Sequence, residues 1–228
     1  MSKSIFFRDD DADRDLPQLR RLLRVFEDHG LPLNCAVIPA TLTDACATLL
    51  TGRGPWLDLH QHGWQHANHE TSGRKCEFGP SRSFAQQFDD ISRGKARLDM
   101  LLGARWSPVF TPPWNRCTTD TYRALASLGF RAISQDRHVP AAEMTSIPVA
   151  VDLYNWKAGP ALKALSLLQS EFNAALAQSA PIGILLHHKV MDEDAFSCLA
   201  DLIRWLEGGP GTTFHTFKEL LEASPWVN

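Results

Sequence analysis

Residues 4–38, SIFFRDDDADRDLPQLRRLLRVFEDHGLPLNCAVI, contain an apolar run, an amphipathic stretch and a second apolar run. The two apolar runs predict β-strands at 4–8 and 33–38. Between them, apolar residues at helical spacing predict a helix at 15–29, with Gly30 as its left-handed stop. A strand, a helix and a second strand in this order are typical of the βαβ unit of a parallel sheet.

The same alternation continues along the rest of the chain. Further strands are predicted at 56–60, 108–111, 130–134, 146–153, 182–187 and 212–214. Further helices are predicted at 41–50, 83–102, 119–128, 161–178, 193–206 and 217–223. Seven or eight strand–helix repeats without a linker or an internal repeat favour a single domain, residues 1–228. The repeat count fits an α/β fold with a closed or nearly closed (β/α) barrel, similar to a TIM barrel.

Composition excludes several classes of protein. The chain has 23 Lys+Arg against 26 Asp+Glu and a net charge of −3, without a basic run, so we expect no nucleic-acid partner. No apolar run approaches the roughly 18 residues that span a bilayer, and the N-terminus turns acidic before a signal peptide could form. We therefore expect a cytoplasmic protein without a membrane partner. Five scattered cysteines without a CxxC pair indicate reduced thiols.

A run of carboxylates follows the first predicted strand, and in parallel α/β folds the binding sites lie at the carboxyl ends of the strands. Asp9, Asp10 and Asp11 are consecutive. A solvated turn or a helix N-cap explains the nearby Asp13 and Asp15 well. It explains Asp9 and Asp10 less well, because adjacent carboxylates at the end of a buried strand repel unless a cation or an arginine lies between them.

Histidines follow two other predicted strands. His62 and His66 are four residues apart, which on one helical turn brings them about 5–6 Å from each other, close enough to bind one metal ion. With a carboxylate from the first strand they would form a site with open positions for water, typical of a catalytic metal centre. A satisfied structural histidine remains the alternative. His187 and His188 end the strand at 182–187, and strand alternation points them in opposite directions.

Four motifs, FRDDDA, HGWQH, FTPPWN and ILLHH, resemble those of the polysaccharide deacetylase superfamily, the carbohydrate esterase group with the NodB homology domain. The family patterns are close to TFDDG, HTxxH, RPPxG and LLHD, in the same order and at similar separations. The resemblance spans residues 6–188. It implies a distorted (β/α)7 barrel and a metal-dependent deacetylase or amidohydrolase that cleaves a non-peptide C–N bond. The first expectation is N-deacetylation of an acetylated amino sugar or a related conjugate.

The resemblance also implies roles for individual residues. Asp9 is expected to be the general base and His187 the general acid, while Asp10, His62 and His66 are expected to bind one divalent metal ion. Zinc is the first candidate, with Co, Ni, Mn and Fe as alternatives, because mixed nitrogen and oxygen ligation suits several ions. The ion would polarise the acyl oxygen and activate a water molecule, the base would take the water's proton, and the acid would protonate the leaving nitrogen.

The chain departs from the family pattern at four positions. Asp11 occupies the family's glycine position, which leaves open whether Asp9/Asp10 or Asp10/Asp11 is the working pair. Thr111 replaces an arginine that normally holds the base, Asn115 replaces a glycine, and His188 replaces an aspartate. The missing arginine puts the base in doubt more than the metal site.

A small-molecule or glycan substrate is expected, and the oligomeric state is left open. Pro113, Trp114, Asn115 and Trp156 are the expected substrate-binding residues. Trp114 suits stacking on a sugar face, or it is simply a packing aromatic. Two alternative functions remain. One is hydrolysis of a non-sugar amide such as a cyclic ureide, and the other is a degenerate barrel that binds a sugar or a metal without turnover, as the threonine at position 111 suggests.

Overall fold

The computed structural model describes residues 3–136, 144–177 and 181–223. Its main sheet has the strand order β6-β5-β4-β3-β2-β1-β10-β7, with β11 also paired to β1, and all of these pairs are parallel. The strands of this sheet are β1 (Lys3–Ala12), β2 (Leu33–Val37), β3 (Leu57–His62), β4 (Trp106–Thr111), β5 (Ala132–Ile133), β6 (Thr145–Ser146), β7 (Val149–Asp152), β10 (Ile182–Leu186) and β11 (Thr212–Phe214). A separate antiparallel pair consists of β8 (Tyr154–Asn155) and β9 (Ala161–Leu162).

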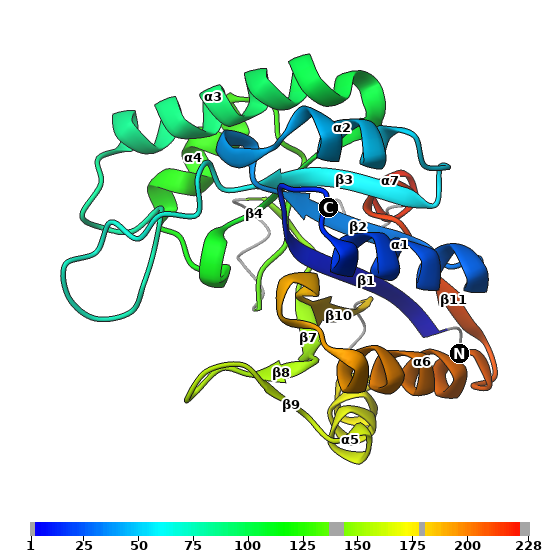
Figure 1. Cartoon of the computed structure of the whole chain (residues 1–228). Coiled ribbons are helices and arrows are strands. Elements are labelled where there is room, and N and C mark those ends of the chain that lie inside the picture. Colours follow the sequence, from blue (N-terminus) through cyan, green and yellow to red (C-terminus); the bar gives the residue numbers. More distant parts are fainter. Residues whose placement is uncertain (1–2, 137–143, 178–180, 224–228) are drawn as a thin grey trace.

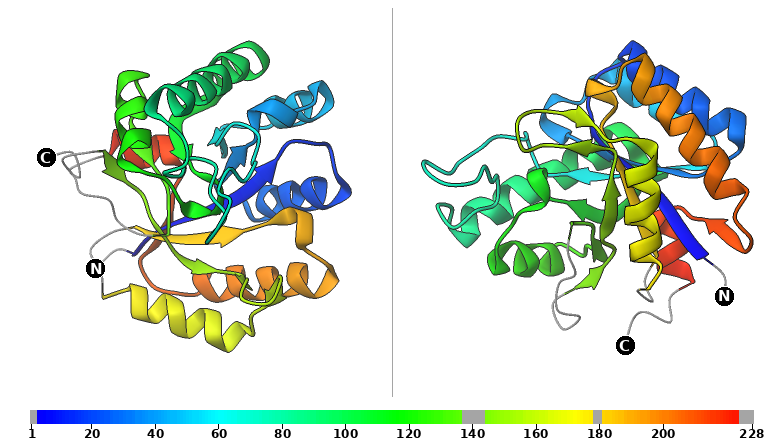
Figure 2. Two further views of the ribbon diagram at one scale, coloured as in Figure 1. Left: turned by 90° about the vertical axis from the view of Figure 1, so that its left-hand side faces the viewer. Right: turned by 90° about the horizontal axis from the view of Figure 1, so that it is seen from below.

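Helices alternate with these strands and, except for α7, lie around the outside of the sheet (Figure 1, Figure 2). They are α1 (Pro17–His29), α2 (Asp44–Thr51), α3 (Phe84–Leu102), α4 (Thr119–Ser127), α5 (Leu165–Ala175), α6 (Glu193–Glu207) and α7 (Phe217–Glu222). Within the described residues, no helix is long and apolar enough to cross a membrane.

One extended segment closes the sheet into a barrel. Its first part, β6, pairs with β5, and its second part, β7, pairs with β10. Only Ile147 and Pro148 separate the two parts, and the N–H of Ile147 still binds the carbonyl of Ile133 at 2.9 Å. The two edge strands of the sheet, β6 and β7, are therefore consecutive in the chain, and this closes the barrel. The distorted (β/α)7 barrel expected from the sequence is confirmed.

Three predicted elements differ from the structure in ways that matter for the site. The strand expected at 146–153 is divided into β6 and β7 around Pro148, a residue without an N–H for the ladder. The helix expected at 161–178 begins only at Leu165, because residues 161–162 pair with β8; its expected last residue lies outside the described residues. The strand expected at 4–8 continues to Ala12, so all three carboxylates belong to β1.

Side-chain alternation divides the strands into an outer and an inner face. Outward apolar residues pack against the helices in the largest core cluster, to which β1 contributes Ile5 and Phe7. Inward residues such as Phe6 and Leu185 form a smaller core inside the barrel together with α7. Since successive side chains of a strand point to opposite faces, Arg8 and Asp10 lie on the inner face with Phe6, and Asp9 lies on the outer face.

Helix α7 seals the amino end of the barrel. The ring of Phe217 packs against Phe6 and His60, with centroid distances of 5.2 and 4.8 Å. Its N–H binds Asn34 Oδ1 at 2.6 Å, and the next N–H, from Lys218, binds Asp58 Oδ2 at 2.7 Å. Two inward polar side chains thereby satisfy the first N–H groups of the helix.

The buried Asp58 predicts a pH-dependent stability. Burial raises its pKa from 3.8 to about 6. The folded state therefore binds this proton more tightly than the unfolded state, and stability falls as the pH rises from about 4 to about 6. In urea unfolding, the stability of Asp58→Asn relative to wild type should increase by about 2 kcal/mol between pH 4.5 and pH 7.5. An identical difference at both pH values would contradict this prediction.

Candidate active site

The three consecutive carboxylates of β1 have three different partners. Asp9 points outward and binds His188, which begins the turn after β10: its Oδ1 accepts the backbone N–H at 2.8 Å and its Oδ2 lies 2.7 Å from the ring Nδ1. Both side chains are fully buried. Burial lowers the pKa of His188, but Asp9 outweighs it and the net shift is upward. This pair joins the carboxyl ends of β1 and β10 on the side of the helices.

Asp10 points into the barrel and is held by Arg8, two residues earlier on the same face. Arg8 Nε and Nη2 each lie 2.9 Å from a different oxygen of Asp10, a two-point ion pair that is fully buried on the arginine side. The guanidinium also donates to Ser134 Oγ at 2.9 Å and to Asn115 Oδ1 at 2.8 Å. Burial raises the pKa of Asp10, but Arg8 and His62 outweigh it and the net shift is downward, so this carboxylate is ionised at neutral pH.

Asp11 forms a cluster with His62 and His66. One ligand atom from each residue lies within 4.8 Å of the other two. Asp11 Oδ1 is 3.2 Å from His62 Nε2 and 3.4 Å from His66 Nε2. Tetrahedral zinc with bonds of 2.0–2.1 Å places its ligands about 3.3 Å apart. One carboxylate oxygen and two imidazole nitrogens at this spacing therefore fit a divalent ion with a position left open.

The backbone of β1 turns Asp11 toward the two histidines. Asp11 has φ +76°, a left-handed conformation that aspartate tolerates better than most residues, and the pairing of β1 with β2 shifts register between Asp9 and Ala12. Without this irregularity, strand alternation would direct Asp11 outward like Asp9. The strained residue places the third carboxylate at the mouth of the barrel instead of among the helices.

The two histidines reach Asp11 from a strand and a turn, not from one helix as the spacing suggested. His62 is the last residue of β3, and His66 lies beyond it with φ +56°. Their ring centroids are 5.2 Å apart. His62 Nδ1 donates to the carbonyl of Thr111 at 3.0 Å, so its Nε2 presents a lone pair to the cluster.

The electrostatic surroundings of the two histidines differ. Burial lowers the pKa of His62, but the carboxylates of Asp10 and Asp11 outweigh it and the net shift is upward. Burial and the charge of His62 lower the pKa of His66 to about 4, so His66 is neutral at pH 7 and free to bind a metal ion. An ion at this site would compete with a proton for Nε2 of His62.

His187 faces the same mouth. It is the residue after β10, and it contributes to the lowered pKa values of both Asp10 and Asp11. The ring of Trp156 packs edge-on against it with centroids 4.6 Å apart, and Trp156 Nε1 donates to Asp152 Oδ2 at 2.9 Å. Trp156 is 43% exposed. The sequence expectation that only one of the two consecutive histidines faces this side agrees with the outward pairing of its neighbour.

A short left-handed turn brings a second tryptophan to the site. Trp114 and Asn115 both have φ +56°, and the Trp114 ring lies over His66 with centroids 4.4 Å apart. Pro113 precedes them and is buried. Asn115, which replaces the glycine of the family pattern, tolerates the left-handed backbone and accepts from Arg8. The tryptophans at 114 and 156 thus each contact a histidine of the candidate site, one a metal-ligand candidate and the other His187.

Of the two carboxylate pairs that the sequence leaves open, these positions favour Asp10/Asp11 over Asp9/Asp10. The structure brings Asp11, not Asp10, together with His62 and His66, and it pairs Asp9 with His188 outside the barrel. The physical reason is that β1 runs past the predicted strand end, which places Asp9 outward and Asp10 inward. Arg8 was overlooked, although its position two residues before Asp10 on a strand was the available signal.

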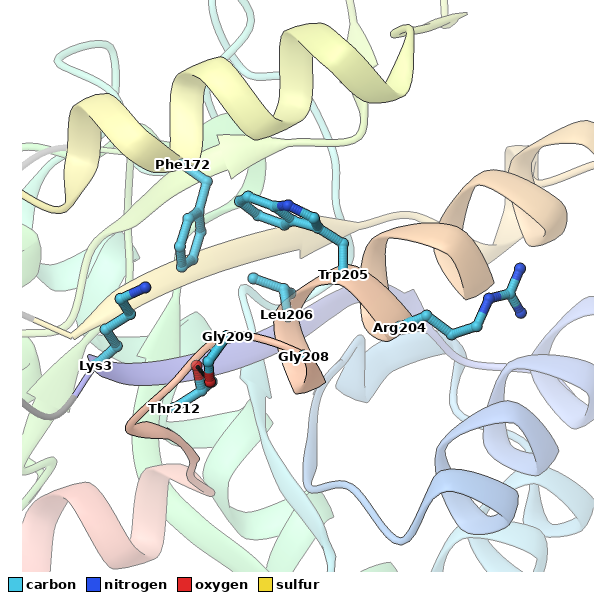
Figure 3. A pocket seen from close by; sticks show the side chains of 8 residues that line it. All are labelled: Lys3, Phe172, Arg204, Trp205, Leu206, Gly208, Gly209 and Thr212. Atoms are coloured by element: carbon cyan, nitrogen blue, oxygen red, sulfur yellow. Dashed lines mark hydrogen bonds between the residues drawn. The ribbon is translucent and has the colours of Figure 1, made fainter.

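A cavity elsewhere in the molecule contains none of the expected site residues. It has a volume of about 380 Å³ and is lined by side chains that include Lys3, Phe172 and Trp205 (Figure 3). Lys3 begins β1, whereas the carboxylates end it. Lys3 and Asp10 are seven positions apart on the strand, about 23 Å at 3.3 Å per residue, so this cavity lies at the opposite end of the barrel.

The chain matches no protein-family model and no curated protein, but it is similar to solved structures. A Mycobacterium smegmatis protein assigned as a polysaccharide deacetylase superposes with a TM-score of 0.78 at 16% identity, over 98% of this chain and 91% of that one. A family 4 carbohydrate esterase from Streptomyces lividans, solved with acetate, superposes with a TM-score of 0.63 at 15% identity, over 95% and 94%. The fold is therefore that of polysaccharide deacetylases, as the motifs implied.

A third structure limits what the fold alone decides. A carbohydrate esterase family 4 pseudoenzyme from Bacillus anthracis superposes with a TM-score of 0.64 at 15% identity, over 96% of this chain and 66% of that one. The same barrel therefore occurs with and without activity. For this chain, function has to be argued from its own side chains.

Proposed function

We propose that this chain is a metal-dependent hydrolase of non-peptide C–N bonds, and that its reaction is N-deacetylation of an acetylated amino sugar or a related conjugate. The observation that carries the proposal is the meeting of Asp11, His62 and His66 at the mouth of the barrel, with Asp10 and His187 beside them. This set offers three candidate metal ligands, an ionised carboxylate and a histidine, which together could supply the metal ion, the base and the acid of a metal-assisted amide hydrolysis.

The metal ligands would be Asp11, His62 and His66. When bound, a divalent ion polarises the acyl oxygen and lowers the pKa of the attacking water. Zinc is the first candidate because two imidazoles and one carboxylate with an open position are typical of catalytic zinc, and mixed ligation leaves Co, Ni, Mn and Fe as alternatives.

The proton transfers fall to Asp10 and His187. Asp10, fixed by Arg8, accepts a proton from the water whose oxygen forms the new bond to the acyl carbon. His187 donates a proton to the nitrogen as the C–N bond breaks, so that acetate and a free amine leave. The two-point contact with Arg8 fixes the direction of the Asp10 carboxylate, which a general base needs for in-line proton transfer.

The substrate would lie against the two tryptophans, each of which contacts a histidine of the site. Trp156 is 43% exposed and Trp114 lies over His66, so both rings present apolar surface next to the reacting groups. Rings of this kind stack on the apolar faces of sugars. Pro113 and Asn115 hold the turn that carries Trp114, which supports their expected part in substrate binding.

The contact between Arg8 and Asp10 weakens the case for a barrel without turnover. That alternative depended on Thr111 at the position of the family's arginine, because a base without a guanidinium partner is poorly held. In this chain a guanidinium reaches Asp10 from within β1 itself. No contact in the described residues favours a cyclic ureide over an acetylated amine, so the ureide is a competing outcome of the assay.

The proposal is tested by metal analysis followed by acetate release. The purified protein should hold about one divalent ion, and the loaded protein should release acetate from at least one member of a panel of N-acetylated amino sugars and their oligomers. Cyclic ureides belong in the same panel. A loaded, folded protein that turns over only a ureide would replace the proposed reaction, and one that binds no ion would refute it.

His187→Ala separates catalysis from binding within this assay. We expect metal content and KM to stay near wild type while kcat on the amide falls by about 10²–10⁴, the usual contribution of one general acid. An activated aryl ester needs no proton on its leaving group, so its hydrolysis should fall much less. His29→Ala, a partly exposed histidine paired with Glu207, is the control for loss of an imidazole. Equal losses on amide and ester would make His187 structural.

A further inference from the structure

The connection between β3 and α3 contains a buried carboxylate that no step above uses. This connection projects from the carboxyl end of the barrel (Figure 1). Glu77, near its end, is fully buried. Its Oε1 accepts the backbone N–H of Gln65 at 2.8 Å and of Ala67 at 3.5 Å, and its Oε2 accepts the N–H of Trp64 at 3.2 Å. One carboxylate thus gathers backbone N–H groups from both sides of His66.

The turn that carries His66, residues 63–67, lies directly against this carboxylate. Gly63 begins it with φ +57°, and a Cβ at that position would lie 2.1 Å from Glu77 Oε2 and 2.6 Å from Pro113 Cγ. Any side chain larger than glycine would therefore displace the carboxylate or the proline. This close contact fixes the position of Gly63, and of the turn that follows it, relative to Glu77.

His66 needs this support because its own backbone is unfavourable. Its φ of +56° is in the left-handed region, which a residue with a Cβ occupies at a cost in free energy unless its surroundings hold it there. In this conformation its Nε2 is 3.4 Å from Asp11 Oδ1. A change of φ to the ordinary negative range would redirect the ring away from Asp11 and His62.

We propose that Glu77 is a positioning residue of the metal centre: its carboxylate binds the backbone on both sides of His66 and fixes the direction of that ligand's ring. The inference rests on the proposed function, since it concerns the same metal site. Glu77 acts through the backbone of residues 64–67 and is itself neither a ligand nor a catalytic group.

The test compares Glu77→Ala and Glu77→Gln with a matched control. Gln87→Ala is that control, because Gln87 is equally buried and bonded, to Arg82, Thr118 and Thr121, without contacting the turn. For each protein we would measure the Kd for Co²⁺ by competition with a chromophoric chelator, the visible spectrum of bound Co²⁺, and the thermal midpoint.

Glu77→Ala should weaken Co²⁺ binding by about 10–100-fold, the usual effect of losing a group that orients a ligand, and should alter the Co²⁺ spectrum. Gln87→Ala should lower the thermal midpoint and leave both metal readouts at wild type. Glu77→Gln keeps one carbonyl oxygen for Gln65 but turns an N–H toward Trp64, so its Co²⁺ affinity should lie between those of Glu77→Ala and wild type.

Wild-type Co²⁺ affinity and spectrum in a folded Glu77→Ala protein would overturn the inference while leaving the metal centre intact. If that variant does not fold, Glu77→Gln decides, because it preserves size: a Kd and spectrum identical to wild type would equally overturn it. A wild-type protein that binds no Co²⁺ would instead refute the proposed function and, with it, this role.

Discussion

Asp11→Asn is expected to remove most of the bound metal and with it the activity, whereas Asp10→Asn is expected to keep the metal and lose about 10²–10⁴ in kcat. The difference follows from their partners. Asp11 is the carboxylate that meets His62 and His66, while Asp10 meets Arg8. A neutral amide is a poor ligand for a divalent ion and cannot accept a proton from water, but in either position it fills the same volume. Elemental analysis and single-substrate kinetics on the three proteins distinguish these roles.

Asp9→Asn is the control for the same set. Its side chain points outward to His188, so we expect normal metal content, most of the turnover, and a loss of stability in urea unfolding. Retention of metal in Asp11→Asn with loss in Asp10→Asn would reinstate the sequence-based register. A catalytic loss confined to Asp9→Asn would assign the base to the outer face, against the geometry described above.

Arg8→Met should be among the most destabilising single changes in the chain. It leaves the Asp10 carboxylate buried without its partner, and breaking a buried ion pair in this way costs about 3–5 kcal/mol. Arg8→Lys keeps the charge but not the two-point contact, so it should fall between wild type and Arg8→Met. Urea unfolding at pH 7 measures each difference. The pair of the exposed Arg20 with Asp15 provides the control, and Arg20→Met should cost far less stability than Arg8→Met, because water screens this pair.

The double variant Arg8→Met/Asp10→Asn separates loss of the pair from loss of packing. Removing both charges relieves the unpaired carboxylate, so the double variant should be more stable than Arg8→Met alone. Additive losses would show that the two side chains do not interact, which would contradict the ion pair. The activity of Arg8→Met should fall with an unchanged metal content, because the guanidinium contacts the proton acceptor and not the metal ligands.

The fold could be predicted from the sequence because its signals are local. The apolar runs and the helical spacing of residues 15–29 do not depend on distant contacts, and the glycine after that helix has the expected left-handed φ of +63°. The predicted elements were wrong where contacts between residues distant in the sequence determine the local structure. Residues 161–162 form a strand only because β8 lies opposite, and no periodicity within the segment reports that pairing.

The sequence indicated the residue types of the candidate site but left open which two of the three aspartates belong to it. The motifs identified His62, His66 and His187 as candidates, and in the structure all three lie near Asp10 and Asp11 at the carboxyl end of the barrel. They could not tell which aspartate faces inward, because that depends on where β1 ends and on the left-handed backbone of Asp11. Arg8 could have been found, because alternation places it on the same face of the strand as Asp10. The support from Glu77 could not, since Glu77 binds the backbone around His66 across a turn that the sequence does not indicate.

The order in which the barrel is assembled bears on its biosynthesis. During translation β1 emerges first, yet two of its parallel neighbours, β10 and β11, emerge only near the end. The three metal-ligand candidates are all synthesised within the first 66 residues, while His187 and the α7 seal come after residue 186. A nascent chain therefore exposes one edge of β1 until late, and edges of this kind invite pairing with other chains.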